Sequence, residues 1–284
     1  MASSNAVEQL PIPGGAISTS DALAAMRNAN GLHPIGRLTD ASNATFLCEL
    51  EGVEPALQVI YKPIRGERPL WDFPEGTLAG REVAAFEVSE ALGLRVVPPT
   101  ILRDGPAGEG AVQLWIEHLG VEVAIAAVNA ADPSLRPIAL FDAIVNNGDR
   151  KAGHLLPISA ERYLGVDHGV TFSTEPKLRT VLWEWRSEPL NESELSALRA
   201  ATAALASNEP GGLNERLTAL ISAEERDALR ARAEELLDRG TFPEPSPDWP
   251  PLPLAADLDL LPTPSYGRSD SSIRSSTVTL GFPP

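Results

Sequence analysis

The chain of 284 residues is long enough to bury a hydrophobic core, as one large domain or as two lobes, and its 43% hydrophobic content is typical of a globular protein. Its 39 acidic and 23 basic residues give a formal charge of −16, so its surface repels nucleic acids and anionic lipid. No apolar run approaches the roughly 20 residues that span a bilayer, and the first residues lack the features of a secretion signal. We therefore expect a cytoplasmic protein without nucleic-acid partners or integral membrane association. The single cysteine, Cys48, excludes an internal disulfide and fits a reducing compartment.

The first 119 residues alternate turn residues with short apolar runs, a pattern typical of strands. Residues 1–15 are polar and then rich in Pro and Gly, which predicts a flexible arm. Ser20 is a suitable capping residue for a short helix. Gly93 ends a longer helix that is predicted to begin near residue 76. The predicted strands cover residues 35–37, 45–50, 56–61, 95–102 and 111–118.

Helical periodicity replaces this pattern after residue 119. From Thr241 the composition becomes rich in Pro, Ser and Asp, which predicts an extended or disordered tail and a place for a protein partner. The predicted helices cover residues 134–146, 191–206 and 213–239. The predicted organisation is a flexible arm (1–15), an N-terminal lobe with a nucleotide-binding sheet (16–119), a helical lobe with the catalytic loop (120–240) and the tail (241–284).

Polar residues are concentrated between residues 146 and 169. An apolar helix ends in a polar loop, a short hairpin follows, and its returning strand delivers Asp167 just before Gly169. This geometry brings Asp149 and Asp167 together at one end of the hairpin, with His154 between them. Converging carboxylates usually hold a divalent cation or accept a proton from a nucleophile.

A second candidate pair lies in the first half of the chain. Lys62 ends an otherwise apolar predicted strand, and Glu82 lies on the core-facing side of the following helix. A buried ammonium needs an acidic partner or a bound anion, so we expect Lys62 and Glu82 to form an ion pair. The alternative is a surface Lys before Pro63 and a solvated helix Glu.

Taken in chain order, Lys62, Glu82, the pair Asp149-Arg150 and an Asp-x-Gly motif at Asp167 resemble the functional residues of the protein-kinase-like superfamily. The motifs are nearest to the phosphatidylinositol 3-/4-kinase branch, whose pattern is Asp-Arg-x-x-x-Asn followed by Asp-x-Gly. The resemblance implies an α+β, two-lobed protein-kinase-like fold, with a small antiparallel-sheet lobe and a helical lobe. It also implies ATP and a divalent cation, Mg or Mn, as cofactors.

The resemblance assigns a role to each matching residue. Lys62, positioned by Glu82, would hold the nucleotide phosphates, and Asp167 would bind the cation that bridges them. Asp149 would orient the incoming hydroxyl or accept its proton. Arg150 would anchor or neutralise the catalytic loop.

The sequence departs from the family at His154, where these kinases usually carry a metal-binding Asn. Imidazole is a softer ligand than an amide oxygen and favours Mn or another transition metal over Mg. His154 is therefore expected either to bind such a metal or to serve structurally. The predicted phosphate loop (36–45) also lacks the glycine run of protein kinases, and its candidate phosphate donors are Ser42 and Asn43.

The segment at residues 113–119 leads from the last predicted strand into the helical half and is the expected hinge. The backbone groups of Ile116, Glu117 and His118 are the candidate partners of adenine. Their side chains give no further guidance.

The expected activity is ATP-dependent transfer of a phosphoryl group to a hydroxyl of a protein, a small metabolite or a lipid headgroup. The few basic residues after Asp167 argue against a phosphoinositide headgroup. The alternative is a catalytically silent nucleotide-binding module with a regulatory or scaffold role, in which His154 marks lost chemistry. A metal-dependent hydrolase is weaker, because no further metal-ligand pattern accompanies the two Asp residues.

Overall fold

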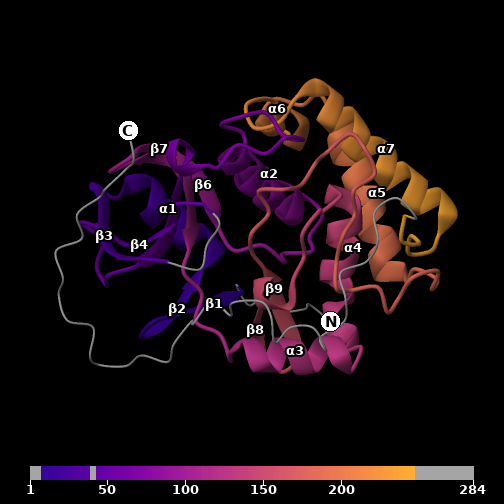
Figure 1. The fold of residues 1–284 in the computed structure, drawn as a ribbon, viewed down its shortest axis with the longest axis horizontal. Coiled ribbons are helices and arrows are strands. Elements are labelled where there is room, and N and C mark those ends of the chain that lie inside the picture. The colour runs from indigo at the N-terminus through magenta and orange to yellow at the C-terminus, as the bar shows by residue number, and fades with distance from the viewer. Residues whose placement is uncertain (1–7, 39–42, 247–284) are drawn as a thin grey trace, which may run out of the picture.

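The computed structural model describes residues 8–38 and 43–246. They form a small lobe built on an antiparallel sheet and a larger lobe built mainly of helices, as Figure 1 shows. The predicted α+β architecture, with a small antiparallel-sheet lobe and a helical lobe, is confirmed. Ser42 and residues 247–284 of the predicted tail lie outside the described residues.

The sheet of the small lobe has the strand order β3-β4-β5-β7-β6, and each neighbouring pair is antiparallel. Side chains alternate between its two faces. Along β5, Val59 and Tyr61 are buried, whereas Ile60 and Lys62 are only partly covered. Lys62 thus lies on the more open face. The strands are β3 (Gly31–Arg37), β4 (Phe46–Glu51), β5 (Gln58–Pro63), β6 (Thr100–Gly105) and β7 (Gly108–Leu114).

An N-terminal hairpin and one helix pack against the buried face of this sheet. Leu10 and Ile12 of the hairpin and Met26 of the helix share a hydrophobic core with Val59 and Tyr61. Part of the segment predicted to be a flexible arm is therefore paired strand instead, because its apolar residues are buried. These elements are β1 (Gln9–Ile12), β2 (Gly15–Ser18) and α1 (Thr19–Asn28).

Helix α2 (Leu78–Ala91) is buried along most of its length. A loop of residues 64–77, which opens with the short helix η1 (Ile64–Gly66), leads into it from β5. The Glu67 carboxylate accepts hydrogen bonds from the backbone amides of Leu78 (3.2 Å) and Ala79 (2.8 Å). The first amides of a helix have no partner within it, so Glu67 fixes where α2 begins.

The large lobe is built around α4, whose residues are almost all buried. Helix α3 was not predicted. The single helix predicted over 213–239 is wrong, because the chain breaks between α6 and α7, where Ser222 and Glu225 form a capping box. The elements are α3 (Val121–Asn129), η2 (Pro133–Leu135), α4 (Arg136–Val145), η3 (Ala152–His154), β8 (Leu155–Ser159), β9 (Arg162–Gly165), α5 (Glu192–Ala206), α6 (Leu213–Thr218) and α7 (Ala223–Arg239).

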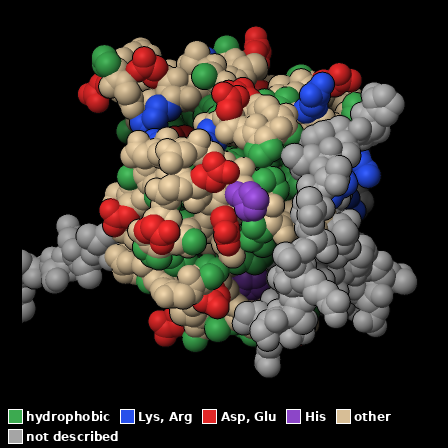
Figure 2. Space-filling view, turned by 90° about the vertical axis from the view of Figure 1, so that its left-hand side faces the viewer, with side chains coloured by type: hydrophobic (Ala, Val, Ile, Leu, Met, Phe, Trp, Pro, Cys, Tyr) green, Lys and Arg blue, Asp and Glu red, His purple; other side chains and the backbone are tan. Residues whose placement is uncertain are grey.

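The surface reflects the acidic composition. Figure 2 views the molecule from the side of the small lobe, and acidic side chains are spread over this face. None of the helices in the described part of the chain has both the length and the apolar character needed to cross a bilayer.

Candidate active site

Lys62 and Glu82 form the ion pair that the sequence predicts. Lys62 lies near the end of β5 on the open face of the sheet, and the side chain of Glu82 on α2 is only 4% exposed. The second carboxylate oxygen of Glu82 accepts a hydrogen bond from the backbone N–H of His168 (3.0 Å). One buried carboxylate therefore joins the sheet to the segment that follows β9.

Asp167 brings a second carboxylate to the same ammonium. Its Oδ1 lies 3.0 Å from Lys62 Nζ, and its side chain is 53% exposed. The positive charge of Lys62 lowers the pKa of Asp167 well below its usual value, so this carboxylate is ionised at neutral pH. Burial alone would lower the pKa of Lys62, but the charges of Asp167 and Glu82 raise it above its usual value.

The backbone of Asp167 has a φ of 62°, which is unusual for a residue other than Gly. A conformation of this kind persists only when its surroundings hold it. Here the next residue, His168, is held through its backbone by Glu82 and through its side chain by Arg150. The position of Asp167 is therefore set by contacts on both sides of the turn.

The loop after α4 presents Asp149 beside a Lys that the sequence analysis missed. The backbone N–H of Asp149 donates to Asn147 Oδ1 (3.0 Å), which holds the turn. Asp149 Oδ2 lies 2.8 Å from Lys151 Nζ, and both side chains are about one-third exposed. The spacing of two residues between Asp149 and Lys151 could have indicated their pairing, because alternate residues of an extended segment face the same side.

Arg150 points the other way, into the protein, and is 0% exposed. Its guanidinium pairs with the equally buried Asp142 of α4 at 2.9 Å and donates to the Val166 carbonyl at 2.7 Å. A residue so placed reaches no substrate. Arg150 is therefore placed to anchor the loop, which is one of the two roles that the resemblance implies for it, and not to touch a substrate.

The same network fixes the protonation of His168. Arg150 Nη2 lies 2.6 Å from His168 Nε2, and because a guanidinium can only donate, that nitrogen must accept. Burial and the charge of Arg150 lower the pKa of His168 well below its usual value. His168 is thus a neutral, buried imidazole that packs edge-on against Phe141, with ring centroids 5.5 Å apart.

His154 lies beside Asp167, with its Nε2 3.4 Å from Asp167 Oδ2. Burial lowers the pKa of His154, and the nearby Asp167 only partly offsets this effect, so the ring is neutral at pH 7. Its Nδ1 is buried and has no hydrogen-bond partner in the described part of the protein. Metal-binding histidines usually donate their second N–H to a carboxylate or carbonyl, and His154 lacks such a partner there.

The expected hinge follows β7. The backbone N–H of Glu117 donates to the carbonyl of Pro11 in β1 (3.0 Å), so this amide is not available to adenine while the hairpin is in place. The remaining backbone groups of Ile116, Glu117 and His118 stay candidates. The N-terminal hairpin therefore contacts the connection between the two lobes.

The phosphate loop is tied to the loop before α2. Asn43 Oδ1 accepts a hydrogen bond from the backbone N–H of Arg68 (2.8 Å). Sequence analysis also missed Leu47 and Ile60, cross-strand neighbours that lie half-buried on the same face as Lys62. Their alternation with buried residues along β4 and β5 was the available signal.

No protein-family model matches the chain. "Protein Rv2133c" of Mycobacterium tuberculosis is 42% identical to it over 247 residues, which cover 75% of this chain and 87% of that protein. The chain belongs to the Rv2133c family. This membership is shown by sequence and brings no activity with it.

Two solved structures resemble this family member distantly. Hydra Fam20, in a structure with sugar, is 17% identical, with 78% of this chain and 87% of that chain covered and a TM-score of 0.46. The Helicobacter pylori proinflammatory kinase CtkA is 14% identical, with coverages of 72% and 96% and a TM-score of 0.41.

The donor groups of this family member can be tested against a divalent cation. No three His, Cys, Asp or Glu side chains form a metal cage within residues 8–38 and 43–246. Asp167 and His154 offer two donors side by side. Mg is commonly held by one or two carboxylates together with substrate phosphates and water. The donor set therefore fits a cation that arrives with a nucleotide better than one held by the protein alone.

Proposed function

We propose that this protein is a phosphotransferase that uses ATP and a divalent cation to phosphorylate a hydroxyl group. The observation that carries the proposal is the position of the Lys62 ammonium, which lies between the buried Glu82 and the half-exposed Asp167. Glu82 is committed to the fold, whereas Asp167 has solvent on its other side. When a nucleotide binds, Lys62 can therefore turn part of its charge to phosphate oxygens, and Asp167 can turn part of its charge to a cation.

The nucleotide would lie under the open face of the sheet. Leu47 and Ile60, half-buried cross-strand neighbours on the same face as Lys62, would supply apolar surface for the base. Lys62 would neutralise phosphate oxygens, and Asn43 and Ser42 would donate to them from the phosphate loop. The amide of Glu117 would take no part, since it is bonded to Pro11.

Asp167 would hold the cation, with His154 beside it. When bound, the cation would neutralise charge on the phosphates and orient them. His154 has two possible contributions. Its Nε2 could ligate the cation directly, which would favour Mn or another transition metal. Alternatively, Nε2–H could donate to Asp167 and orient that carboxylate, a role consistent with the absence of a described partner for Nδ1.

The chain's own residues account for the transfer step in the following way. Asp149 orients the acceptor hydroxyl and takes its proton as the oxygen attacks the γ-phosphorus. Lys151, 2.8 Å from Asp149, contributes positive charge where the transferring group gathers negative charge. Arg150 and Asp142 hold the loop rigid from below. Rigid placement matters because positioning and charge supply most of the catalysis in phosphoryl transfer.

The acceptor is a hydroxyl of a protein, a small metabolite or a lipid headgroup. A phosphatidylinositol headgroup, suggested by the nearest branch in sequence, is the least supported of the three. Lys177, a basic residue after Asp167, is already paired with Asp72 at 3.0 Å and lies over the ring of Trp71. A phosphorylated headgroup would have to displace these contacts.

A silent nucleotide-binding module is the second candidate, favoured by His154 at the position of a metal-binding Asn and by the pairing of Asp149 with Lys151. Incubating the full chain with γ-labelled ATP and Mg or Mn distinguishes the two. Metal-dependent ADP formation that is lost in Asp149→Asn supports the enzyme. Binding of ATP without any turnover supports the silent module.

A further inference from the structure

The loop between β5 and α2, residues 64–77, spans the phosphate side of the candidate site. At one end the backbone of Arg68 is bonded to Asn43 of the phosphate loop. At the other end Asp72 pairs with Lys177 of the segment after Asp167, at 3.0 Å. The loop thus connects the candidate phosphate loop with the segment after Asp167.

This loop encloses a cavity of about 130 Å³. A cavity of roughly this volume accepts a leucine- or benzene-sized group. It adjoins the candidate site, because Ile64 is two residues beyond Lys62, and a Cβ placed on Gly169 would lie 3.4 Å from Leu78 Cβ. The apolar residues that line it are Ile64, Pro69, Leu70, Phe73, Pro74 and Leu78.

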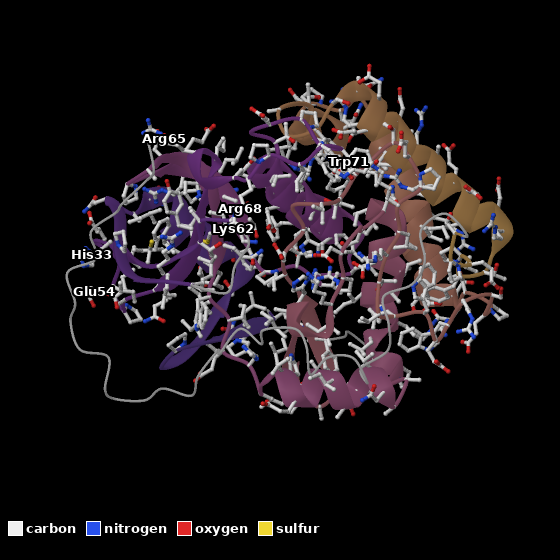
Figure 3. All side chains as sticks on the ribbon, in the orientation of Figure 1. His33, Glu54, Lys62, Arg65, Arg68 and Trp71 are labelled. Atoms are coloured by element: carbon white, nitrogen blue, oxygen red, sulfur yellow. The ribbon has the colours of Figure 1, made fainter. Side chains whose placement is uncertain are left out.

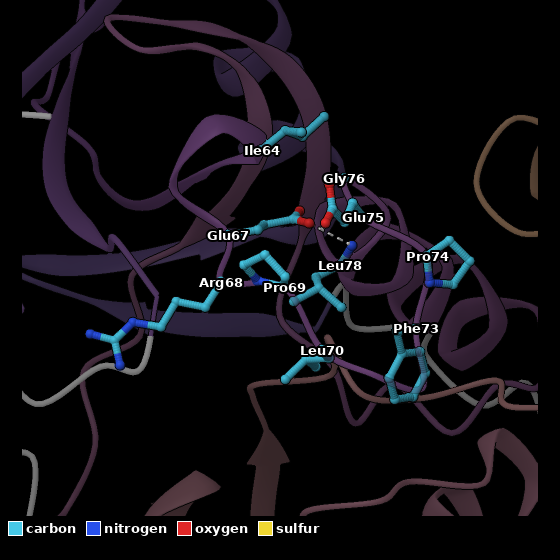
Figure 4. A pocket seen from close by; sticks show the side chains of 10 residues that line it. All are labelled: Ile64, Glu67, Arg68, Pro69, Leu70, Phe73, Pro74, Glu75, Gly76 and Leu78. Atoms are coloured by element: carbon cyan, nitrogen blue, oxygen red, sulfur yellow. Dashed lines mark hydrogen bonds between the residues drawn. The ribbon is translucent and has the colours of Figure 1, made fainter. Parts of the chain in front are cut away.

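The rim of the cavity carries an exposed cation. Arg68 lines the cavity, and in Figure 4 its side chain extends away from Phe73 and Pro74. Within the described part of the chain its guanidinium has no carboxylate partner, although acidic residues outnumber basic ones by 39 to 23 in the sequence. Glu67 is engaged with the first amides of α2, and Glu75 contributes the other charge of the rim. The cavity therefore suits an apolar residue next to an acidic one.

The chain itself contains such a sequence beyond the described residues. Asp257-Leu258-Asp259-Leu260-Leu261 alternates acidic and apolar residues. The next stretch is dense in hydroxyl groups, at Thr263, Ser265, Ser269, Ser271, Ser272, Ser275, Ser276, Thr277 and Thr279. The apolar side chains match the cavity, and the carboxylates match Arg68.

We propose that residues 257–261 dock on the loop of residues 64–77 and present the Ser and Thr residues of 263–279 as phosphoryl acceptors. This inference rests on the proposed phosphotransferase activity and names its substrate as the chain's own tail. The bond between the γ-phosphorus of ATP and its bridging oxygen breaks, and a bond to the side-chain oxygen forms. The hydroxyl proton passes to Asp149, and ADP leaves.

A linker of ten residues joins the described body of the protein to the docking sequence. Residues 247–256 separate the last described residue, Ser246, from the docking sequence and can extend over up to roughly 35 Å. The first hydroxyl, Thr263, follows Leu261 by two residues, and the others continue to Thr279. The acceptors therefore cover a range of distances from the cavity.

The experiment uses the full-length protein, ATP and Mg or Mn, with phosphorylated residues mapped by mass spectrometry over time. We expect phosphate on Ser or Thr within 263–279. Arg68→Glu should slow tail phosphorylation about fivefold, the size expected for one exposed ion pair. Combining Arg68→Glu with Asp257→Lys and Asp259→Lys should restore most of the rate, because the loop then carries the negative charge and the docking sequence the positive charges.

Arg65→Glu is the matched control. Arg65 is exposed on the same loop but does not line the cavity, and Figure 3 shows it apart from Arg68. The rate of tail phosphorylation in Arg65→Glu should stay within about twofold of the parent rate, the variation expected for surface charges. Replacing Leu258, Leu260 and Leu261 by Asn should also slow tail phosphorylation without touching the described body of the protein.

Each failure has its own signature. Metal-dependent ADP formation or phosphorylation of an added acceptor, with no phosphate in 263–279, would overturn the tail as substrate and leave the proposed function intact. Tail phosphorylation that is insensitive to both Arg68→Glu and the Leu replacements would overturn the docking site. ATP binding with neither ADP nor phosphopeptides would overturn the phosphotransferase and this inference together.

Discussion

Two groups of charges lie close together in this fold and differ in their surroundings. The buried network joins Asp142, Arg150 and His168, and each of these side chains is 0% exposed. The open cluster joins Lys62 and Asp167, whose side chains are 22% and 53% exposed. The same types of residue therefore lie in different environments, one closed to water and one open to it. The access of water decides whether a charged group can bind a ligand.

In the buried network the partners are fixed. Arg150 donates to Asp142, to the Val166 carbonyl and to His168, and no face is left for a ligand. In the open cluster Asp167 keeps a solvent-exposed side and Lys62 holds it from one direction only. The buried network should hold the loop after α4, so breaking it should lower the free energy of unfolding. The open cluster should bind the ligand, so breaking it should lower the affinity for ATP and the cation.

Breaking the buried network should give the largest effect on stability. Asp142→Ala leaves the Arg150 guanidinium buried without its carboxylate, which should lower the free energy of unfolding by about 3–5 kcal/mol. Urea titration of parent and variant measures the difference. Asp104→Ala, at an exposed position near the end of β6, is the control and should change it by less than about 0.5 kcal/mol. A loss below about 1 kcal/mol for Asp142→Ala would show that the network does not support the fold.

Lys62 contacts both the buried Glu82 and the exposed Asp167, so its replacement should change stability and ligand binding together. Lys62→Ala strands the buried Glu82 and removes the phosphate contact, so stability should fall by about 2 kcal/mol, less than for a fully buried pair. The double variant Lys62→Ala, Glu82→Ala should recover part of the stability but none of the ATP affinity, as measured by calorimetric titration with ATP and Mg or Mn. Recovery of affinity in the double variant would remove Lys62 from the nucleotide site.

The smallest expected effect concerns His154 and the identity of the cation. If Nε2 is a ligand, His154→Asn should move the preference between Mg and Mn toward Mg by roughly tenfold, because an amide oxygen is the harder ligand. The measurement is the ratio of ATP affinities with Mg and with Mn for parent and variant. An unchanged ratio with a lower melting temperature would assign His154 to orienting Asp167 instead.

Much of the fold follows from local sequence signals. The apolar run before Lys62 and the helix that ends at Gly93 predict β5 and α2, and these elements bring Lys62 to Glu82. The polar loop and hairpin that carry Asp149 and Asp167 were also visible, because a short hairpin has few possible geometries.

Tertiary contacts could not be predicted in the same way. Asp149 and Arg150 are adjacent in sequence, and only packing against Asp142 reveals that the second is buried. The hairpin of β1 and β2 was taken for a flexible arm, since its Pro and Gly residues conceal the burial of Leu10 and Ile12. Helix propensity across 213–239 likewise concealed the capping box at Ser222.

The most direct test of the account is the stabilisation of the protein by ATP and metal. At about 100 times its dissociation constant, a ligand adds about 2.7 kcal/mol of stability, which should raise the melting temperature by roughly 5 °C or more for a chain of this size. In Asp167→Ala the metal-dependent part of this shift should disappear, whereas Asp104→Ala should keep it. If Asp167→Ala keeps the same metal-dependent shift as the parent, Asp167 does not hold the metal and nucleotide, and the central claim is wrong.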